Sequence, residues 1–171
     1  ARSGYSKQDG FEIYLKGFSL GKKLWETIWE AGKDFNISPG CPNLIDRIEG
    51  GLLSYGNEFT LENNPIECNL EKYCSDKGDH DFIGKESVIE SLSSGARWLG
   101  LVCQERGPNP RPGHMVFDGP GDSAKKVGYV TSGGPSPSLN KTGIAMGYFE
   151  EVSLGQELWI QASSRRRIKS I

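Results

Sequence analysis

The sequence predicts an α+β region followed by a small antiparallel β-barrel. A change in the spacing of apolar residues along the chain supports this prediction. Residues 19–94 hold three segments whose apolar residues recur at helical spacing. Residues 96–171 instead hold short apolar runs separated by Gly/Pro turns, which is typical of an antiparallel barrel or sandwich. The change falls at a Ser-Ser-Gly run that ends at Gly95, so we expect one domain over residues 1–95 and another over 96–171.

A strand is predicted first, over residues 11–15, directly after a glycine-punctuated turn over residues 4–10. Phe, Ile and Leu alternate there with polar residues, and this period of two buries one face of a strand and exposes the other. Glu12 lies on the polar face, with its carboxylate held close to the turn. Taken by itself, a glutamate in this position is usually solvated.

The first helix is predicted to begin at Ser19, which is a suitable N-cap, and to run to about Asp34. Its apolar stripe is widened by Trp25 and Trp29. Stripes of this width usually face a core, so we expect both tryptophans to be buried.

The second helix is predicted to follow Pro42, which suits a first helical turn. It carries Asp46, Arg47 and Glu49, which we expect to form an exposed, salt-bridged face. The two glycines at 50–51 weaken the helix there or let another backbone approach closely.

A third helix is predicted over residues 82–94, and five short strands follow it. Turn-forming Gly and Pro residues separate all of the strands, including a Gly-Gly-Pro run at 133–135. The predicted strands are residues 98–102, 113–117, 127–131, 144–149 and 158–162.

The composition argues against several classes of partner. A formal net charge of -2 gives no sign of nucleic acid or of an anionic membrane, and no apolar run reaches the length of a membrane span. The four cysteines form no CxxC pair and show no zinc-ligand spacing with the two histidines. We therefore expect reduced thiols, no metal, and a cytoplasmic protein, or one of the mitochondrial matrix if the source is eukaryotic.

Three motifs stand out by their order and spacing: GYSKQDGFEIY at 4–14, CPNLIDRIEGGLLSYGNEFTLENNPIEC at 41–68, and VGYVTSGGPSPSLNKTGIAMGY at 127–148. Together with DFIGKE at 81–86, they resemble the C-terminal half of the glycine cleavage T-protein family, the tetrahydrofolate-dependent aminomethyltransferases. The resemblance covers essentially the whole chain. It implies the C-terminal part of a folate-binding α+β domain, followed by the family's C-terminal barrel.

The resemblance also implies that the catalytic aspartate lies in the N-terminal half of such proteins. No catalytic residue is therefore expected in this chain. The chain begins without Met, directly before a motif, and its last residues, 165–171, are predicted to be the middle of a further strand beyond the five above. We expect a piece of a longer polypeptide, inactive alone, whose partner is the N-terminal half of the same protein.

Tetrahydrofolate is the cofactor that the resemblance implies, and Glu12 matches the family's pterin-binding glutamate. A carboxylate accepts both N–H groups on the aminopyrimidine edge of a pterin, and such charge-assisted pairs are strong. Tyr5 matches a family tyrosine that contacts the folate, where an aromatic face suits a flat heterocycle. A turn-anchoring tyrosine in the core is the alternative for Tyr5.

Two positions depart from the aminomethyltransferase pattern. Asn43 stands where those enzymes carry an arginine, so a charged contact with folate is lost or replaced by neutral hydrogen bonds. Lys72 stands where they carry a tryptophan against the cofactor, and the neighbouring Tyr73 offers a substitute aromatic surface. Lys72 either attracts the glutamate tail of folate or is a solvated surface lysine. Glu67, in a nearby loop, is expected to cap that loop, with contact to substrate or folate as the alternative.

The run GCPNLIDRIEGGLLSYGN resembles the dimethylsulfoniopropionate demethylase-like members of the family, whereas TSGGPSPSL is closer to the aminomethyltransferases. The prediction is therefore methyl transfer to tetrahydrofolate from a small-molecule sulfonium, amine or methoxy donor. Three alternatives remain open: an aminomethyltransferase of the glycine cleavage system, the folate-binding tail of a dimethylglycine or sarcosine dehydrogenase, and a non-catalytic folate-binding protein.

Overall fold

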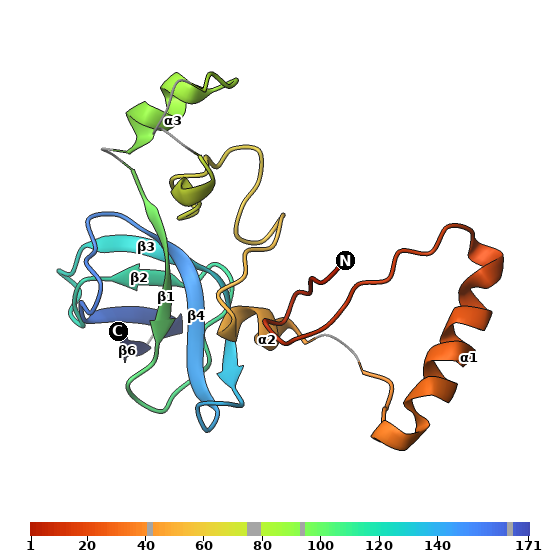
Figure 1. The fold of residues 1–171 in the computed structure, drawn as a ribbon. Coiled ribbons are helices and arrows are strands. Elements are labelled where there is room, and N and C mark those ends of the chain that lie inside the picture. The colour runs from red at the N-terminus through yellow and green to blue at the C-terminus, as the bar shows by residue number, and fades with distance from the viewer. Residues whose placement is uncertain (41–42, 75–79, 93–94, 164–165) are drawn as a thin grey trace.

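A computed structural model describes residues 1–40, 43–74, 80–92, 95–163 and 166–171. A β-barrel occupies the C-terminal part of the chain, and the N-terminal part forms an open arrangement of short helices and loops (Figure 1). This is the α+β region followed by a small antiparallel barrel that the sequence predicts.

Six antiparallel strands form the barrel, in the order β1-β4-β3-β2-β5-β6. Backbone hydrogen bonds between Val102 and Ile171, at 2.7 and 3.0 Å, join the end of β1 to the end of β6. They close the sheet, which leaves no long free edge. The strands are β1 Arg97–Val102, β2 Met115–Phe117, β3 Lys126–Ser136, β4 Thr142–Phe149, β5 Leu158–Ser163 and β6 Arg166–Ser170.

Strand β3 continues through the Gly-Gly-Pro run that the sequence analysis assigned to a turn, so that assignment was wrong. Gly133 and Gly134 pair with Ala145 and Ile144 of β4. A Cβ on Gly133 would lie 2.9 Å from Pro110 Cβ. Glycine is needed here for a close approach of two chain segments, and not for a reversal of direction.

All six strands contribute apolar side chains to the interior of the barrel, which forms the main core. Large aliphatic residues and one phenylalanine fill it. The most deeply buried are Val116, Val130, Phe149, Leu158, Ile160 and Ile168.

Helix α2 (Leu44–Glu49) packs on the outside of the barrel against β3 and β4. Its Ile45 and Ile48 form a second buried cluster with Ile144 and Met146 of β4. The predicted start of this helix at Pro42 lies outside the described residues. Two shorter elements follow, the 3-10 turn η3 (Glu71–Tyr73) and helix α3 (Lys85–Ser91), the latter inside the predicted third helix.

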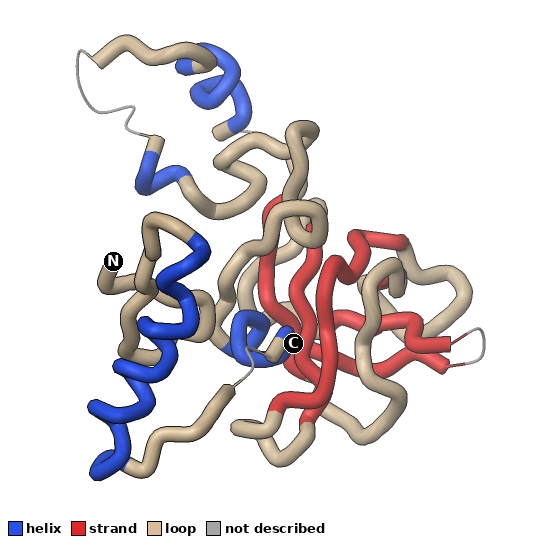
Figure 2. The backbone as a smooth tube through the Cα atoms, turned by 90° about the vertical axis from the view of Figure 1, so that its right-hand side faces the viewer, coloured by secondary structure: helices blue, strands red, loops and turns tan. Residues whose placement is uncertain are grey.

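Helix α1 (Gly21–Gly32) stands apart from the barrel in both views (Figures 1 and 2). The expectation that its tryptophans are buried was wrong, because Trp25 is 57% and Trp29 39% exposed, and the two rings stack on each other at 6.0 Å. Ser19 is not the N-cap either. It lies within the 3-10 turn η1 (Phe18–Leu20), which leads directly into the helix, and a second such turn, η2 (Lys33–Phe35), follows the helix.

The predicted first strand is also not formed. Residues 11–15 are extended but pair with no strand of the described chain, and Phe11 is 76% exposed. Their backbone is tied only at Glu12, whose N–H donates to the Ala1 carbonyl at 2.9 Å. A strand needs a neighbour to accept its hydrogen bonds, and none is present here. No helix in the described part of the chain is long and apolar enough to cross a membrane.

Candidate functional site

Helix α2 begins at Asn43, one of the predicted folate-binding residues. The Asn43 side chain accepts a hydrogen bond from Ile45 N at 3.0 Å, and the Asp46 carboxylate accepts one from Asn43 N at 3.3 Å. This reciprocal pair is a capping box, which stabilises the first turn of a helix. The structure thus places the Asn43 side chain on its own helix, and its contact with folate stays a prediction.

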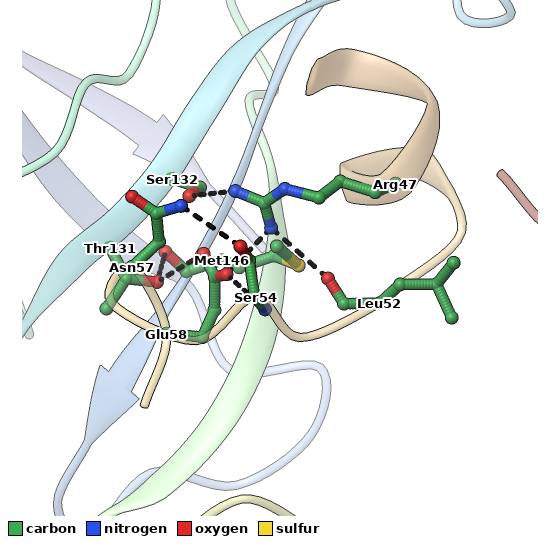
Figure 3. A network of polar contacts seen from close by, with 8 residues as sticks. All are labelled: Arg47, Leu52, Ser54, Asn57, Glu58, Thr131, Ser132 and Met146. Carbon is green, nitrogen blue, oxygen red and sulfur yellow. Dashed lines mark hydrogen bonds and ion pairs between the residues drawn. The ribbon is translucent and has the colours of Figure 1, made fainter. Parts of the chain in front are cut away.

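Arg47 of α2 is the centre of a buried polar network (Figure 3). Its Nη1 donates to Glu58 Oε2 at 2.7 Å and to the Leu52 carbonyl at 3.2 Å, and its Nη2 donates to Ser132 Oγ at 2.7 Å. The Arg47 and Glu58 side chains are 4% and 0% exposed. The sequence-based expectation of an exposed face was wrong for Arg47, because the loop after α2 folds over the guanidinium.

Glu58 accepts hydrogen bonds from more partners than its arginine. It accepts a hydrogen bond from Ser54 N at 2.9 Å, and Thr131 Oγ1 lies 3.2 Å from its second oxygen (Figure 3). A buried carboxylate needs donors for its oxygens to offset the cost of its desolvation, and Arg47, Ser54 and Thr131 supply them. Glu58 and Ser132 were not predicted from the sequence, although both lie inside the family-like motifs at 41–68 and 127–148.

Glu49, at the end of α2, makes a second link to the barrel. Its carboxylate accepts hydrogen bonds from Ser136 Oγ, from Ser138 N at 3.1 Å and from Ser138 Oγ at 2.9 Å. The Ser136 bond, followed by the two from Ser138, holds the pKa of Glu49 below its ordinary value. Glu49 therefore does not belong to a salt-bridged surface, and α2 is fixed to the turn between β3 and β4.

The lowered pKa of Glu49 predicts a pH-dependent stability. Because the folded-state pKa is the lower one, the ionised carboxylate stabilises the fold fully above the ordinary value of 4.5, and this contribution is lost as the pH falls through the lowered pKa. We expect urea unfolding of Glu49→Gln to differ most from that of the wild type near neutral pH. The difference should shrink below the ordinary pKa.

Glu62→Gln is the matched control, because Glu62 is exposed and only its backbone N–H makes a hydrogen bond. It should follow the wild type at every pH. A difference between Glu49→Gln and wild type that stays constant across the acidic range would contradict the assignment.

Glu12 lies on the surface, within the N-terminal loop. Its Oε2 accepts hydrogen bonds from Ser3 Oγ and, at 3.3 Å, from Tyr14 OH. An ionised carboxylate accepts about four hydrogen bonds, so acceptor capacity remains for the two N–H groups of a pterin edge. Glu12 thus fits the group that it is predicted to hold.

Tyr5 is 48% exposed and lies on the glycine-rich turn of the same loop. The alternative of a core tyrosine is therefore wrong for the described residues. An exposed aromatic ring on the loop that also carries Glu12 is compatible with contact to a flat heterocycle.

Lys72 and Tyr73, on η3, contact each other and not Glu12. The Lys72 ammonium lies 4.8 Å from the centre of the Tyr73 ring, and both side chains are exposed. No hydrogen bond or ring contact in the described residues joins this pair to Glu12, so their role in folate binding stays a prediction. Glu67 accepts a hydrogen bond from Asn64 N at 3.1 Å, which confirms that it caps its loop.

Cys68 and Cys103 are buried thiols that are not set up as nucleophiles. Cys68 Sγ lies 3.2 Å from Tyr148 OH, and burial is the main cause that raises the pKa of both groups. Burial also raises the pKa of Cys103 to about 11. These groups are protonated at neutral pH, and a thiol must ionise before it attacks. Cys68, Cys74 and Cys103 are free, Cys41 lies outside the described residues, and no cluster of metal-ligating side chains occurs in the described part.

A pocket of about 610 Å³ lies between the end of α2 and strands β1 and β4. Its lining is mainly apolar, from residues such as Ile48, Trp98, Leu139 and Met146. None of the five residues predicted to bind the cofactor lines it. It is therefore distinct from the predicted pterin site.

The fold and the site together define a protein in which a capped helix is fixed to a closed antiparallel barrel, with an exposed carboxylate loop beside the helix. The family model described as GCVT N-terminal domain matches residues 1–77, and that described as Glycine cleavage T-protein C-terminal barrel domain matches residues 97–169. The chain belongs to the glycine cleavage T-protein family. Tetrahydrofolate is the cofactor of this family.

Relatives of two kinds are similar to the chain. A dimethylsulfoniopropionate demethylase from Ruegeria pomeroyi is 43% identical over 148 residues, which cover 81% of this chain and 37% of the relative. An aminomethyltransferase from Acidobacterium capsulatum is 36% identical over 171 residues, covering 94% of this chain and 43% of the relative. The glycine cleavage aminomethyltransferase T of Bartonella henselae, a solved structure, has a TM-score of 0.75 at 28% identity, covering 99% of this chain and 46% of the other. The chain thus spans less than half the length of these relatives.

Proposed function

We propose that this chain supplies the tetrahydrofolate-binding portion of a methyltransferase that moves a methyl group from a small-molecule donor to tetrahydrofolate. The observation that carries the proposal is the exposed Glu12 carboxylate, set in a loop of the T-protein family with acceptor capacity left for a pterin edge. Tetrahydrofolate supplies the ring nitrogen that receives the one-carbon unit. The chain's own residues bind and orient that ring.

A demethylase-like donor is supported by the similarity to the dimethylsulfoniopropionate demethylase at 43% identity. It is also supported by Asn43, an uncharged residue that caps its own helix at the position where aminomethyltransferases carry an arginine. In this reaction the bond between the methyl carbon and the donor sulfur, nitrogen or oxygen breaks and a carbon–nitrogen bond forms. The ring nitrogen releases its proton to solvent when a sulfonium leaves as a neutral sulfide, and to the leaving nitrogen or oxygen when the donor is an amine or a methoxy compound.

Aminomethyl transfer is the second candidate, since aminomethyltransferases are also similar to the chain and one is similar in structure. The two candidates differ in the folate product, because methyl transfer yields 5-methyltetrahydrofolate and aminomethyl transfer yields 5,10-methylenetetrahydrofolate.

The exposed apolar surface of the N-terminal part supports the further proposal that the chain works within a longer polypeptide. Phe11, Phe18 and Trp25 are each more than half exposed, on segments that the barrel does not cover. Exposed apolar surface on this scale marks a region that another part of a protein covers. We propose that the rest of the longer polypeptide covers it and supplies the catalytic aspartate, so that this chain alone is inactive.

Glu12→Gln in the complete polypeptide tests the proposal. The variant keeps the shape of the side chain but loses the charge and replaces one acceptor oxygen by a donor. A hydrogen bond to a charged group contributes about 1.5–3 kcal/mol, so we expect the Kd for tetrahydrofolate to rise about 10- to 150-fold. Isothermal titration calorimetry measures it directly.

Glu26→Gln is the control for this titration, because Glu26 is an exposed glutamate on α1 that makes only a surface ion pair with Lys22. Its Kd should equal that of the wild type. An unchanged Kd in Glu12→Gln would show that Glu12 does not bind the pterin.

A further inference from the structure

The loop that carries Glu12 packs against the C-terminal end of helix α2. The backbone of Lys7 is left-handed, with φ of 58°, and this turn brings the loop against the end of the helix. A Cβ built on Gly50 would lie 3.4 Å from Lys7 Cβ, at van der Waals contact. Figure 1 shows the N-terminal segment passing directly beside α2. Gly50 has ordinary helical angles, with φ of -73°, so its backbone does not require glycine.

Two side chains near the C-terminal end of helix α2 fix the helix to the barrel. Arg47 reaches Ser132 of β3, and Glu49 binds Ser136 and Ser138 at the end of that strand. These contacts hold the helix end in place relative to the barrel. The surface that Gly50 offers is therefore a rigid one.

The loop itself is closed, so its seat determines where its carboxylate lies. Glu12 N donates to the Ala1 carbonyl at 2.9 Å, and Ser3 Oγ donates to the Glu12 carboxylate. Lys7 lies midway between these ends. A displacement at Lys7 is thereby transmitted to Glu12 through a short, hydrogen-bonded loop.

We propose that Gly50 is a positioning residue for tetrahydrofolate: the absence of a branched side chain there lets the Lys7 turn pack on α2, so that the barrel sets the position of the Glu12 carboxylate. The inference rests on the proposed function, in which Glu12 reads the pterin edge. It assigns to the barrel a part in folate binding that requires no contact between barrel and folate.

Gly50→Val in the complete polypeptide tests this role. A Cβ at this position would already lie 3.2 Å from the Asp46 carbonyl oxygen and 3.4 Å from Lys7 Cβ, so the two further carbons of valine press against the turn. We expect the Kd for tetrahydrofolate to rise at least about tenfold, whereas Gly50→Ala, whose Cβ meets Lys7 at ordinary contact distance, stays within about threefold of the wild type. Gly121→Val is the matched control, because a Cβ there meets nothing within 4 Å.

Lys7 provides a test that leaves α2 untouched. Proline fixes φ near -65°, so Lys7→Pro cannot keep the left-handed turn and should weaken binding at least about tenfold. Lys7→Gly keeps the turn and removes the contacting Cβ. Combined with Gly50→Val, it should restore at least about threefold of the lost affinity, a coupling that a merely destabilised helix would not show.

The outcomes separate this inference from the proposed function. If the wild type binds tetrahydrofolate and Glu12→Gln binds it weakly, but Gly50→Val and Lys7→Pro both bind like the wild type, the positioning role is wrong and the proposed function stands. If the wild type does not bind tetrahydrofolate, the proposed function itself fails.

Discussion

Arg47→Ala is expected to lower the free energy of unfolding by about 3–5 kcal/mol, because it leaves the Glu58 carboxylate buried without its counter-charge. In the wild type the two side chains are 4% and 0% exposed and meet at 2.7 Å. The variant also removes the donors to the Leu52 carbonyl and to Ser132 Oγ. Urea unfolding of the complete protein, followed by circular dichroism, measures the loss.

Two controls make this prediction specific. Replacing the pair together, as Arg47→Met with Glu58→Leu, removes both buried charges and should recover most of the lost stability. Lys22→Ala removes an exposed ion pair to Glu26, at 3.7 Å, and should cost less than about 1 kcal/mol. If Arg47→Ala cost no more than Lys22→Ala, the buried network would not stabilise the junction of α2 and the barrel.

The barrel was predictable from the sequence because its information is local. Short apolar runs between turn residues indicate strands wherever they pair, and closure follows when the last strand bonds back to the first. The local rule failed at Gly133, where glycine serves a close approach to Pro110 across the fold. A contact between residues so far apart in the chain leaves no periodic signal.

The roles of the charged residues on α2 were not predictable for the same reason. Arg47 lies 85 positions before Ser132, and Glu49 lies 87 before Ser136. Charge spacing along a helix indicates which residues share a face, but burial depends on which loop and strand fold over that face.

In the N-terminal part of the chain, the sequence pattern identifies apolar faces but not what covers them. Alternating and helical apolar patterns predict burial for the residues of one face, yet Phe11 and Trp25 are exposed. A period identifies an apolar face, whereas the partner that covers the face has to come from elsewhere. The predicted folate-binding residues are likewise not brought together within the described chain. Glu12 and Tyr5 lie on one exposed loop, whereas Asn43 and Lys72 contact residues of their own elements.

The second large effect concerns the reaction. We expect the complete polypeptide that contains this chain to convert tetrahydrofolate to 5-methyltetrahydrofolate when a methyl donor is present. Among the donors of the proposed function, we expect a sulfonium such as dimethylsulfoniopropionate to react fastest, because its positively charged sulfur leaves as a neutral sulfide. Positioning of carbon and nitrogen at near-contact distance supplies much of the acceleration. Glu12→Gln should lower kcat/KM by about 10- to 150-fold, in line with its loss of binding.

The donor comparison tests this account most directly. The complete protein and tetrahydrofolate are incubated in turn with dimethylsulfoniopropionate, dimethylglycine, glycine betaine and a methoxyaromatic acid, and the folate products are separated by chromatography and identified by mass. The account predicts 5-methyltetrahydrofolate and an equal amount of demethylated donor from at least one of them. Formation of 5-methyltetrahydrofolate from none, together with 5,10-methylenetetrahydrofolate from an aminomethyl-lipoyl donor, would contradict it.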